Sequence, residues 1–178
     1  MRKSKILQVA QLGNAVIRQK AKAVKNVHDP EIQELIENMI ATCKDSNGVG
    51  IAAPQVYEPL RIFIIWSHPN SRYPKAPKMK PIAMINPRIL KKSHKMKKDW
   101  EGCLSVPGIR ALVPRSISVE VEYTDRKGKV EKKKLSHNFV ARIFQHELDH
   151  LNGIVFLDRA RSKDILTEKE YQLLMKKK

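Results

Sequence analysis

The chain has 178 residues, 42% of them hydrophobic, which is enough for one hydrophobic core. We therefore expect a single domain over residues 1–178. No stretch approaches the roughly 20 consecutive apolar residues that span a bilayer, and residues 1–12 mix Arg2, Lys3 and Lys5 with short apolar pieces. These features predict a chain with neither a membrane helix nor a secretory signal.

The chain is strongly basic, because Lys and Arg number 35 against 18 Asp and Glu and give a formal net charge of +17. The lysines gather at residues 91–98, 132–134 and 176–178. Such clusters favour RNA or another anionic partner, although a solvated surface that keeps the protein soluble explains them equally well. The two cysteines, Cys43 and Cys103, are too few for a disulfide scaffold, so we expect a reducing cytoplasm.

The first clear element is a helix that begins at Pro30. Apolar residues recur at helical spacing from Ile32 to Cys43, and Asp29 is placed to be the N-cap. The small residues and the proline of residues 48–55 (GVGIAAPQ) predict a tight loop. Residues 61–66 (RIFIIW) predict a buried strand, and the prolines of residues 67–81 predict an extended surface loop.

The second half of the chain predicts strands followed by two helices. A short apolar run covers residues 82–85. Residues 117–123 alternate between apolar and polar side chains, as a half-buried antiparallel strand does, and a turn follows at residues 125–128. From a Ser136 N-cap, an apolar stripe predicts a helix that ends at Gly153. A brief strand at residues 154–157 and a C-terminal helix over about residues 164–178 complete the prediction.

The central helix contains His146-Glu147-Leu148-Asp149-His150, the H-E-x-x-H pattern. Two imidazoles four residues apart lie on one helical face and can reach one metal, and the glutamate beside the first can act on a water held there. A surface helix that carries two histidines by chance is the alternative.

A catalytic metal needs a third protein ligand, and the downstream residues offer a poor one. Where one class of zinc proteases places a third histidine, this chain has Phe156. Glu170 lies in a lysine-rich segment, where a solvated charge is the expected role. Cys103 is the better candidate, since a thiolate and two imidazoles suit a first-row metal and leave a position for water. Without the helix, an ordinary core thiol would be the preferred interpretation of Cys103.

Three segments in this order resemble the signature motifs of the peptide deformylase family: Gly48–Gln55 (GVGIAAPQ), Glu101–Ser105 (EGCLS) and Gln145–His150 (QHELDH). The resemblance extends from about Ile6 to Asp158, and the C-terminal helix is similar to that of the family's Gram-negative-type class. It implies an α+β fold in which antiparallel β-sheets pack around the central H-E-x-x-H helix. It also implies a metal-dependent hydrolase that removes the N-formyl group from the N-terminal formyl-methionine of nascent proteins and releases formate.

The same resemblance implies a metal site and the residues that serve it. Cys103, His146 and His150 would bind one divalent metal, Fe(II) in the cell, with Zn, Ni or Co able to replace it. The implied catalytic residues are Glu147, which would move the proton, and Gln55 and the backbone N–H of Leu104, which would stabilise the oxyanion. Glu101 would orient His146.

The implied substrate-binding residues lie in the first two motifs and outside the motifs. Val49, Gly50, Gly102 and Arg110 match family positions that line the substrate, and Phe139 and Ile143 could form a pocket for the methionine side chain. The expected partners are N-formyl-methionyl nascent peptides, with a transient ribosome contact through the basic surface and the C-terminal helix. No membrane or DNA partner is expected, and the expected location is a bacterial cytoplasm.

Two other functions stay open at this stage. A zinc endopeptidase would use the same helix with Glu170, but it leaves the two upstream motifs unexplained. A basic RNA-binding or ribosome-associated module would carry a closed structural metal site, whereas three ligands and an adjacent glutamate are found here. The metal content of a Glu170→Gln variant tests the first alternative, and loss of formate release on chelation excludes the second.

Overall fold

The structure, a computed structural model, describes residues 4–70 and 73–177. Arg2, Lys3 and Lys178, which belong to the predicted basic ends, lie outside the described residues, as do residues 71–72 of the predicted loop. The helices are α1 (Pro30–Asp45), α2 (Asn138–His150) and α3 (Glu168–Lys176), with 3-10 helices η1 (Ala15–Arg18), η2 (Ala53–Val56), η3 (Phe156–Arg159) and η4 (Ser162–Asp164).

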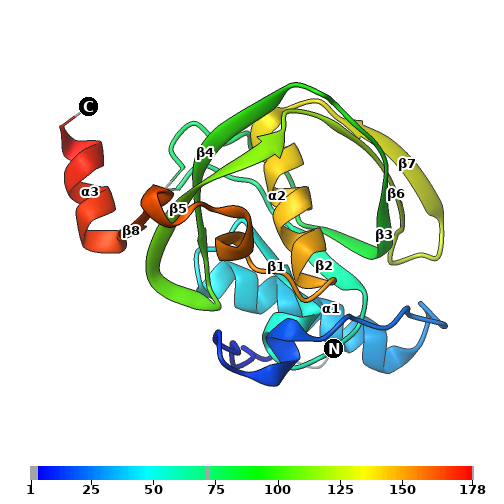
Figure 1. Ribbon diagram of the computed structural model, residues 1–178. Helices are drawn as coiled ribbons and strands as arrows, with labels where there is room; N and C mark the ends of the chain where they lie inside the picture. The colour runs from blue at the N-terminus through cyan, green and yellow to red at the C-terminus, as the bar shows by residue number, and fades with distance from the viewer. Residues whose placement is uncertain (1–3, 71–72, 178) are drawn as a thin grey trace.

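The strands form two antiparallel sheets, which Figure 1 shows on either side of α2. The larger sheet has the order β1-β2-β3-β6-β7; its strands are β1 (Gly50–Ala52), β2 (Ile62–Ile65), β3 (Ile82–Lys92), β6 (Val119–Thr124) and β7 (Val130–Leu135). The smaller sheet has the order β4-β5-β8, with β4 (Met96–Cys103), β5 (Val106–Ser116) and β8 (Ile165–Thr167).

The larger sheet is covered on both faces at β2, whereas β6 and β7 have an exposed outer face. Along β2, Phe63 and Ile65 belong to the core cluster that packs on α2, whereas Ile62 and Ile64 belong to the cluster that packs on α1. Side chains alternate across a strand, so a strand covered on both faces is apolar at every position. The layers are therefore α1, the larger sheet, α2 and the smaller sheet, and α2 is the buried centre.

Several local predictions are confirmed. Asp29 caps α1 by accepting a hydrogen bond of 2.9 Å from the Glu31 N–H, and Pro30 is the first helical residue. Alternate residues of β6 are buried, and the chain turns back to β7 between Asp125 and Gly128, as the 3.0 Å backbone hydrogen bond between these residues shows. The α+β fold with antiparallel sheets around the H-E-x-x-H helix is also confirmed.

The C-terminal region differs from the prediction. Residues 154–157 were expected to form a strand, but Phe156 begins the 3-10 helix η3 instead. The C-terminal helix was expected from about residue 164; residues 165–167 form strand β8 against β5, and α3 begins only at Glu168, after the Thr167 N-cap. The N-cap of α2 is His137 rather than Ser136.

The central helix was expected to end at Gly153; α2 ends at His150, and Gly153 closes the turn that follows it. Its φ of +72° is in the left-handed region, and a Cβ there would lie 2.4 Å from the Arg18 carbonyl oxygen. No helix in the described part of the chain is long and apolar enough to cross a membrane. Because α2 packs on strands of both sheets, we propose that these elements form a single domain.

Candidate active site

Two histidines of α2 and one cysteine of β4 meet at the centre of the molecule. His146 and His150 lie one helical turn apart, with ring centroids separated by 5.0 Å. Cys103 is the last residue of β4, and its Sγ lies 3.2 Å from Nε2 of His150. One possible ligand atom from each of the three residues lies within 4.8 Å of the others. Residues 47 positions apart in the sequence thus form a compact donor set.

The electrostatics of this cluster favour a thiolate. Burial alone would raise the pKa of the Cys103 thiol, but the positive charge of His150 and hydrogen bonds from both imidazoles lower that pKa well below its usual value. Burial lowers the pKa of His146, yet hydrogen bonds with Cys103 and Glu101 raise it well above the usual value. A soft thiolate beside two imidazoles is a donor set that fits a first-row transition metal.

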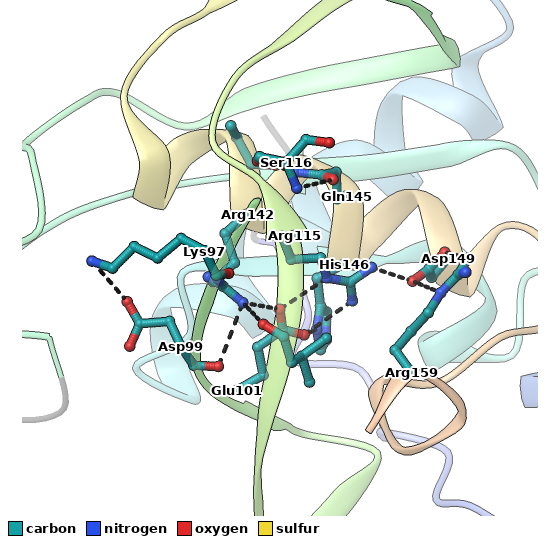
Figure 2. A network of polar contacts seen from close by, with 12 residues as sticks. Lys97, Asp99, Glu101, Arg115, Ser116, Arg142, Gln145, His146, Asp149 and Arg159 are labelled. Carbon is teal, nitrogen blue, oxygen red and sulfur yellow. Dashed lines mark hydrogen bonds and ion pairs between the residues drawn. The ribbon is translucent and has the colours of Figure 1, made fainter. Parts of the chain in front are cut away.

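A buried carboxylate from β4 holds the first histidine in place, as Figure 2 shows. Nδ1 of His146 donates a 2.9 Å hydrogen bond to Oε2 of Glu101, which leaves Nε2 as the nitrogen that can face a metal. Glu101 is only 3% exposed and also accepts hydrogen bonds from Arg115 and Arg142. Although burial raises the pKa of this carboxyl, hydrogen bonds from His146 and Arg115 lower it well below the usual range.

Further polar contacts join α2 to the smaller sheet (Figure 2). Arg115 also pairs with Asp149, whose carboxylate accepts two hydrogen bonds from Arg159 on η3. The Arg142 guanidinium donates to the carbonyl oxygens of Lys97 and Val113, at 2.6 and 2.8 Å. Each of these four side chains has at least one charged or carbonyl partner. The network therefore fixes the rotation of α2 relative to β4 and β5.

Glu147 lies between the two histidines in sequence but in a different environment. Its carboxyl is buried, its Oε2 has no hydrogen-bond partner among the described residues, and burial raises its pKa to about 7. Gly50 lies against it, since a Cβ on Gly50 would be 2.5 Å from Oε1 of Glu147. A carboxyl with such a pKa can exchange a proton near neutral pH.

The side-chain amide of Gln55 points toward the Cys103 thiol. Its Oε1 accepts a 2.8 Å hydrogen bond from the Ala52 N–H, which fixes the orientation of the amide. Its Nε2 then donates toward the Ser105 hydroxyl, at 3.1 Å, and toward Sγ of Cys103, at 3.4 Å. Gln55 therefore presents an N–H donor beside the candidate metal site.

One pocket brings together most of the residues that the sequence predicted for the site. Its lining includes the predicted residues Val49, Gly50, Gln55, Glu101, Gly102, Cys103, Leu104, Phe139, Ile143, His146 and Glu147. It also includes Gly48, Tyr73, Trp100 and Arg142, which the sequence analysis missed. Gly48 and Trp100 directly flank predicted positions, whereas Tyr73 lies in the proline-rich loop and offers no signal in the sequence.

Two predicted residues lie behind this pocket lining. His150 is 1% exposed and reaches the site through its Nε2 atom. Arg110, which was expected to contact substrate, is 5% exposed and pairs with Glu168 at 2.6 Å. Glu170, the alternative third ligand, is exposed on α3 and does not belong to the donor set found among the described residues.

Comparisons with known proteins agree on one family. A family model described as polypeptide deformylase matches residues 6–165. Peptide deformylase 2 of Nostoc sp. (strain PCC 7120) is 57% identical over 173 residues, which are 97% of this chain and 96% of the relative. Peptide deformylase 2 of Shewanella oneidensis is 44% identical over 89% of this chain and 86% of the relative.

A solved structure has the same fold. The Met-Ala-Ser-bound class I type b peptide deformylase of Acinetobacter baumannii superposes with a TM-score of 0.85 at 43% identity. The match covers 88% of this chain and 99% of the solved one.

Proposed function

This chain belongs to the peptide deformylase family, and we propose that the pocket between α2 and the ends of β1 and β4 is the site of its reaction. The activity is metal-dependent hydrolysis of the N-formyl group of formyl-methionyl nascent proteins, with release of formate. The observation that supports the location best is the meeting of Cys103, His146 and His150 beside Glu147.

Because Cys103 and His146 line the pocket, a metal held by the three residues would be accessible there to substrate and water. A divalent metal, when bound there, supplies a Lewis acid that polarises the formyl oxygen and lowers the pKa of water. Glu101 keeps His146 in the tautomer and orientation that ligation needs.

Glu147 is the group that moves the proton in this proposal. With a pKa near 7, its carboxylate can accept a proton from the attacking water and return it to the amine that leaves. Gln55 is placed to donate through Nε2 to the oxyanion that develops on the formyl carbon, and the Leu104 N–H is the second proposed donor. Donors of this kind are each worth roughly 3 kcal/mol in kcat.

The peptide binds, in this proposal, between two strand edges. β1 is an edge strand of the larger sheet and β4 is an edge strand of the smaller sheet, so Val49, Gly50 and Gly102 can offer backbone groups to an extended chain. Phe139 and Ile143 provide apolar walls for the methionine side chain. The similar Acinetobacter enzyme is bound to Met-Ala-Ser, and a peptide of this kind is a suitable test substrate.

The direct test is formate release from formyl-Met-Ala-Ser. We expect the purified protein to release formate, to lose this activity on chelation and to regain it when Zn(II), Ni(II) or Co(II) is added back. A protein that stays fully active after its metal has been removed and measured as absent would contradict the proposal.

For the resident metal, we propose Fe(II), with Zn, Ni or Co as replacements. The support is chemical, because a thiolate with two imidazoles binds all of these ions. Oxidation of either iron or sulfur would spoil an iron site. Metal analysis of anaerobically purified protein tests this, and we expect air to inactivate the iron form faster than the nickel form. Equal lifetimes in air, or an iron-free protein from cells, would contradict it.

We also propose a transient ribosome contact in the cytoplasm, through α3 and the basic surface. α3 projects from the body of the molecule (Figure 1), and its Lys169 and Lys176 are exposed, as are Leu173 and Leu174. Binding to ribosomal RNA should weaken linearly with the logarithm of salt concentration. Deletion of Gln172–Lys178 should reduce ribosome affinity without changing formate release. Unchanged ribosome affinity would contradict the proposal.

A further inference from the structure

The first turn of α3 is attached to a buried arginine of the smaller sheet. No residue of α3 is buried, yet its Glu168 carboxylate accepts hydrogen bonds from Nε and Nη2 of Arg110, at 2.6 and 3.4 Å. The Tyr171 ring covers the guanidinium of Arg110 at 5.2 Å and contacts the Trp100 ring edge-on, also at 5.2 Å. These contacts join α3 to the wall of the pocket, because Trp100 is part of that wall.

The third nitrogen of the guanidinium, Nη1, contacts two residues that line the pocket, and Arg110 itself lines an adjoining hollow with Gly102, Cys103 and Leu104. Nη1 of Arg110 lies 3.4 Å from the Tyr73 hydroxyl. A Cβ on Gly102 would be only 2.5 Å from Nη1, so the arginine packs directly on the backbone there. Tyr73 and Gly102 both line the pocket, and the Tyr73 ring packs on Phe139 at 4.8 Å. Arg110 thus reaches from α3 to the part of the pocket wall formed by Tyr73 and Gly102, which we call the outer end of the pocket.

The pairing changes what this arginine can recognise. A guanidinium that is 5% exposed has little water to screen it, and a free one would attract a carboxylate strongly. Glu168 occupies the Nε and Nη2 edge and cancels the net charge. Nη1 donates one N–H to the Tyr73 hydroxyl and has a second N–H, which suits a neutral carbonyl oxygen.

We propose that Glu168 and Tyr171 position and neutralise Arg110, so that the outer end of the pocket accepts the main-chain carbonyl of a continuing peptide and disfavours a peptide ending there in a carboxylate. The inference rests on the proposed location of the reaction. Gly102 directly precedes Cys103, so Arg110 is within reach of the second or third peptide residue, at about 3.3–3.6 Å per residue. A nascent chain has no carboxylate at that point, whereas a short free peptide does.

The test compares formyl-Met-Ala-Ser with its C-terminal amide. In Glu168→Gln, the side-chain size is kept and the negative charge is lost. We expect kcat/KM for the free acid to rise about tenfold, mainly through KM, as one poorly screened charge pair would produce. The kcat/KM for the amide should change less than about threefold. Glu170→Gln, on the exposed side of the same helix, is the matched control and should change neither value.

A second variant identifies the group responsible. In the double variant Arg110→Gln with Glu168→Gln, the new preference for the acid should disappear. An equal loss on acid and amide in Glu168→Gln would show that the pair only supports the fold, and it would overturn this proposal. Persistence of the preference without Arg110 would overturn it as well. If the wild-type protein released formate from neither peptide, the proposed function itself would fail, and this inference with it.

Discussion

Two buried glutamates of the site have opposite environments and therefore opposite roles. Burial raises the pKa of Glu147 to about 7, and its Oε2 has no partner among the described residues. Burial also acts on Glu101, but hydrogen bonds from His146 and Arg115 outweigh it and lower its pKa. Glu147 is thus suited to exchange a proton at neutral pH, whereas Glu101 stays charged and holds its neighbours.

The first prediction concerns the proton carrier. Glu147→Gln keeps the size of the side chain and removes the base, so the protein should keep its metal while kcat falls by at least the roughly 100-fold typical of general acid–base catalysis. Formate release and metal content are measured on the same sample. Glu31→Gln, an exposed glutamate of α1, is the control and should retain full activity. Activity near wild type in Glu147→Gln would exclude the assigned role.

At the residue scale, the motifs predicted those side-chain positions that depend only on spacing within one element. The i, i+4 spacing of His146 and His150 places both imidazoles on one face of any helix. Arg115 and Arg142 were missed, although both contact Glu101. Neither arginine belongs to a motif, and their partner lies 14 and 41 residues away, so only the tertiary structure shows the contact.

At the scale of elements, one carboxylate links three of them. Glu101 of β4 accepts hydrogen bonds from Arg115 of β5 and from Arg142 and His146 of α2. All four side chains are at most 11% exposed. The orientation of α2 therefore depends on a buried ionic network, and removal of its central charge leaves Arg142 without a carboxylate partner and Arg115 with Asp149 alone.

A second prediction tests this link. Glu101→Gln should lower the free energy of unfolding by about 3–5 kcal/mol, the usual cost of breaking a buried ion pair. It should also weaken metal binding about 10–100-fold, since His146 loses its carboxylate partner. Glu122→Gln, in a more exposed pair with Arg88, should cost much less, because solvent screens that pair. Urea unfolding and metal titration measure both effects, and similar small losses in the two variants would refute the buried network's role.

A third prediction concerns η3 and pH. Asp158 accepts a 2.8 Å hydrogen bond from the Val155 N–H and pairs with Arg18. Burial raises the pKa of its carboxyl, but these contacts outweigh it and lower the pKa in the folded protein. The stabilisation is therefore complete above the unfolded-state pKa of about 3.9 and is lost as pH falls through the lower folded value.

Asp158→Asn should accordingly destabilise the protein at pH 7 by roughly 1 kcal/mol, because the pair is partly exposed and screened. The difference between wild type and variant should shrink as the pH falls below about 4. Urea unfolding at pH 7 and at acid pH measures it. A difference that does not change with pH would show that the Asp158 charge contributes nothing.

Each element that the sequence analysis missed or misassigned has a physical reason. β4 and β7 carry exposed lysines where an amphipathic strand would be apolar, so no alternation marks them. In residues 154–157, Val155 and Phe156 are buried, and burial of two neighbouring apolar residues does not distinguish a strand from a 3-10 helix. β8 was assigned to the helix because its pairing with β5 is not local.

At the scale of the whole molecule, some basic side chains form ion pairs, whereas others are exposed. On the outer face of the larger sheet, Glu122 pairs with Arg88 and Lys132 on the two neighbouring strands, so part of the lysine cluster is neutralised by cross-strand contacts. Composition alone could not separate these paired residues from the exposed lysines of α3. The fold class, by contrast, followed from the ordered motifs, because each of them supplies one part of the same site.

The candidate metal site is formed by parts of the chain that meet only in the folded molecule. Cys103 comes from the smaller sheet and both histidines come from α2, which the larger sheet covers on its other side. Cys43, the other cysteine, is a residue of α1 and is 0% exposed in the core. Cys43 can therefore serve as the matched control for Cys103, because we assign the Cys103 thiol to the metal and the Cys43 thiol to packing.

The central claim is that the Cys103 thiolate is a metal ligand, and the metal stoichiometry of Cys103→Ser tests it most directly. A neutral hydroxyl binds a first-row metal far more weakly than a thiolate, so this variant should be purified with little metal and should release no formate. Cys43→Ser should keep both its metal and its activity. Full metal occupancy with wild-type formate release in Cys103→Ser would contradict the ligand assignment and the mechanism built on it.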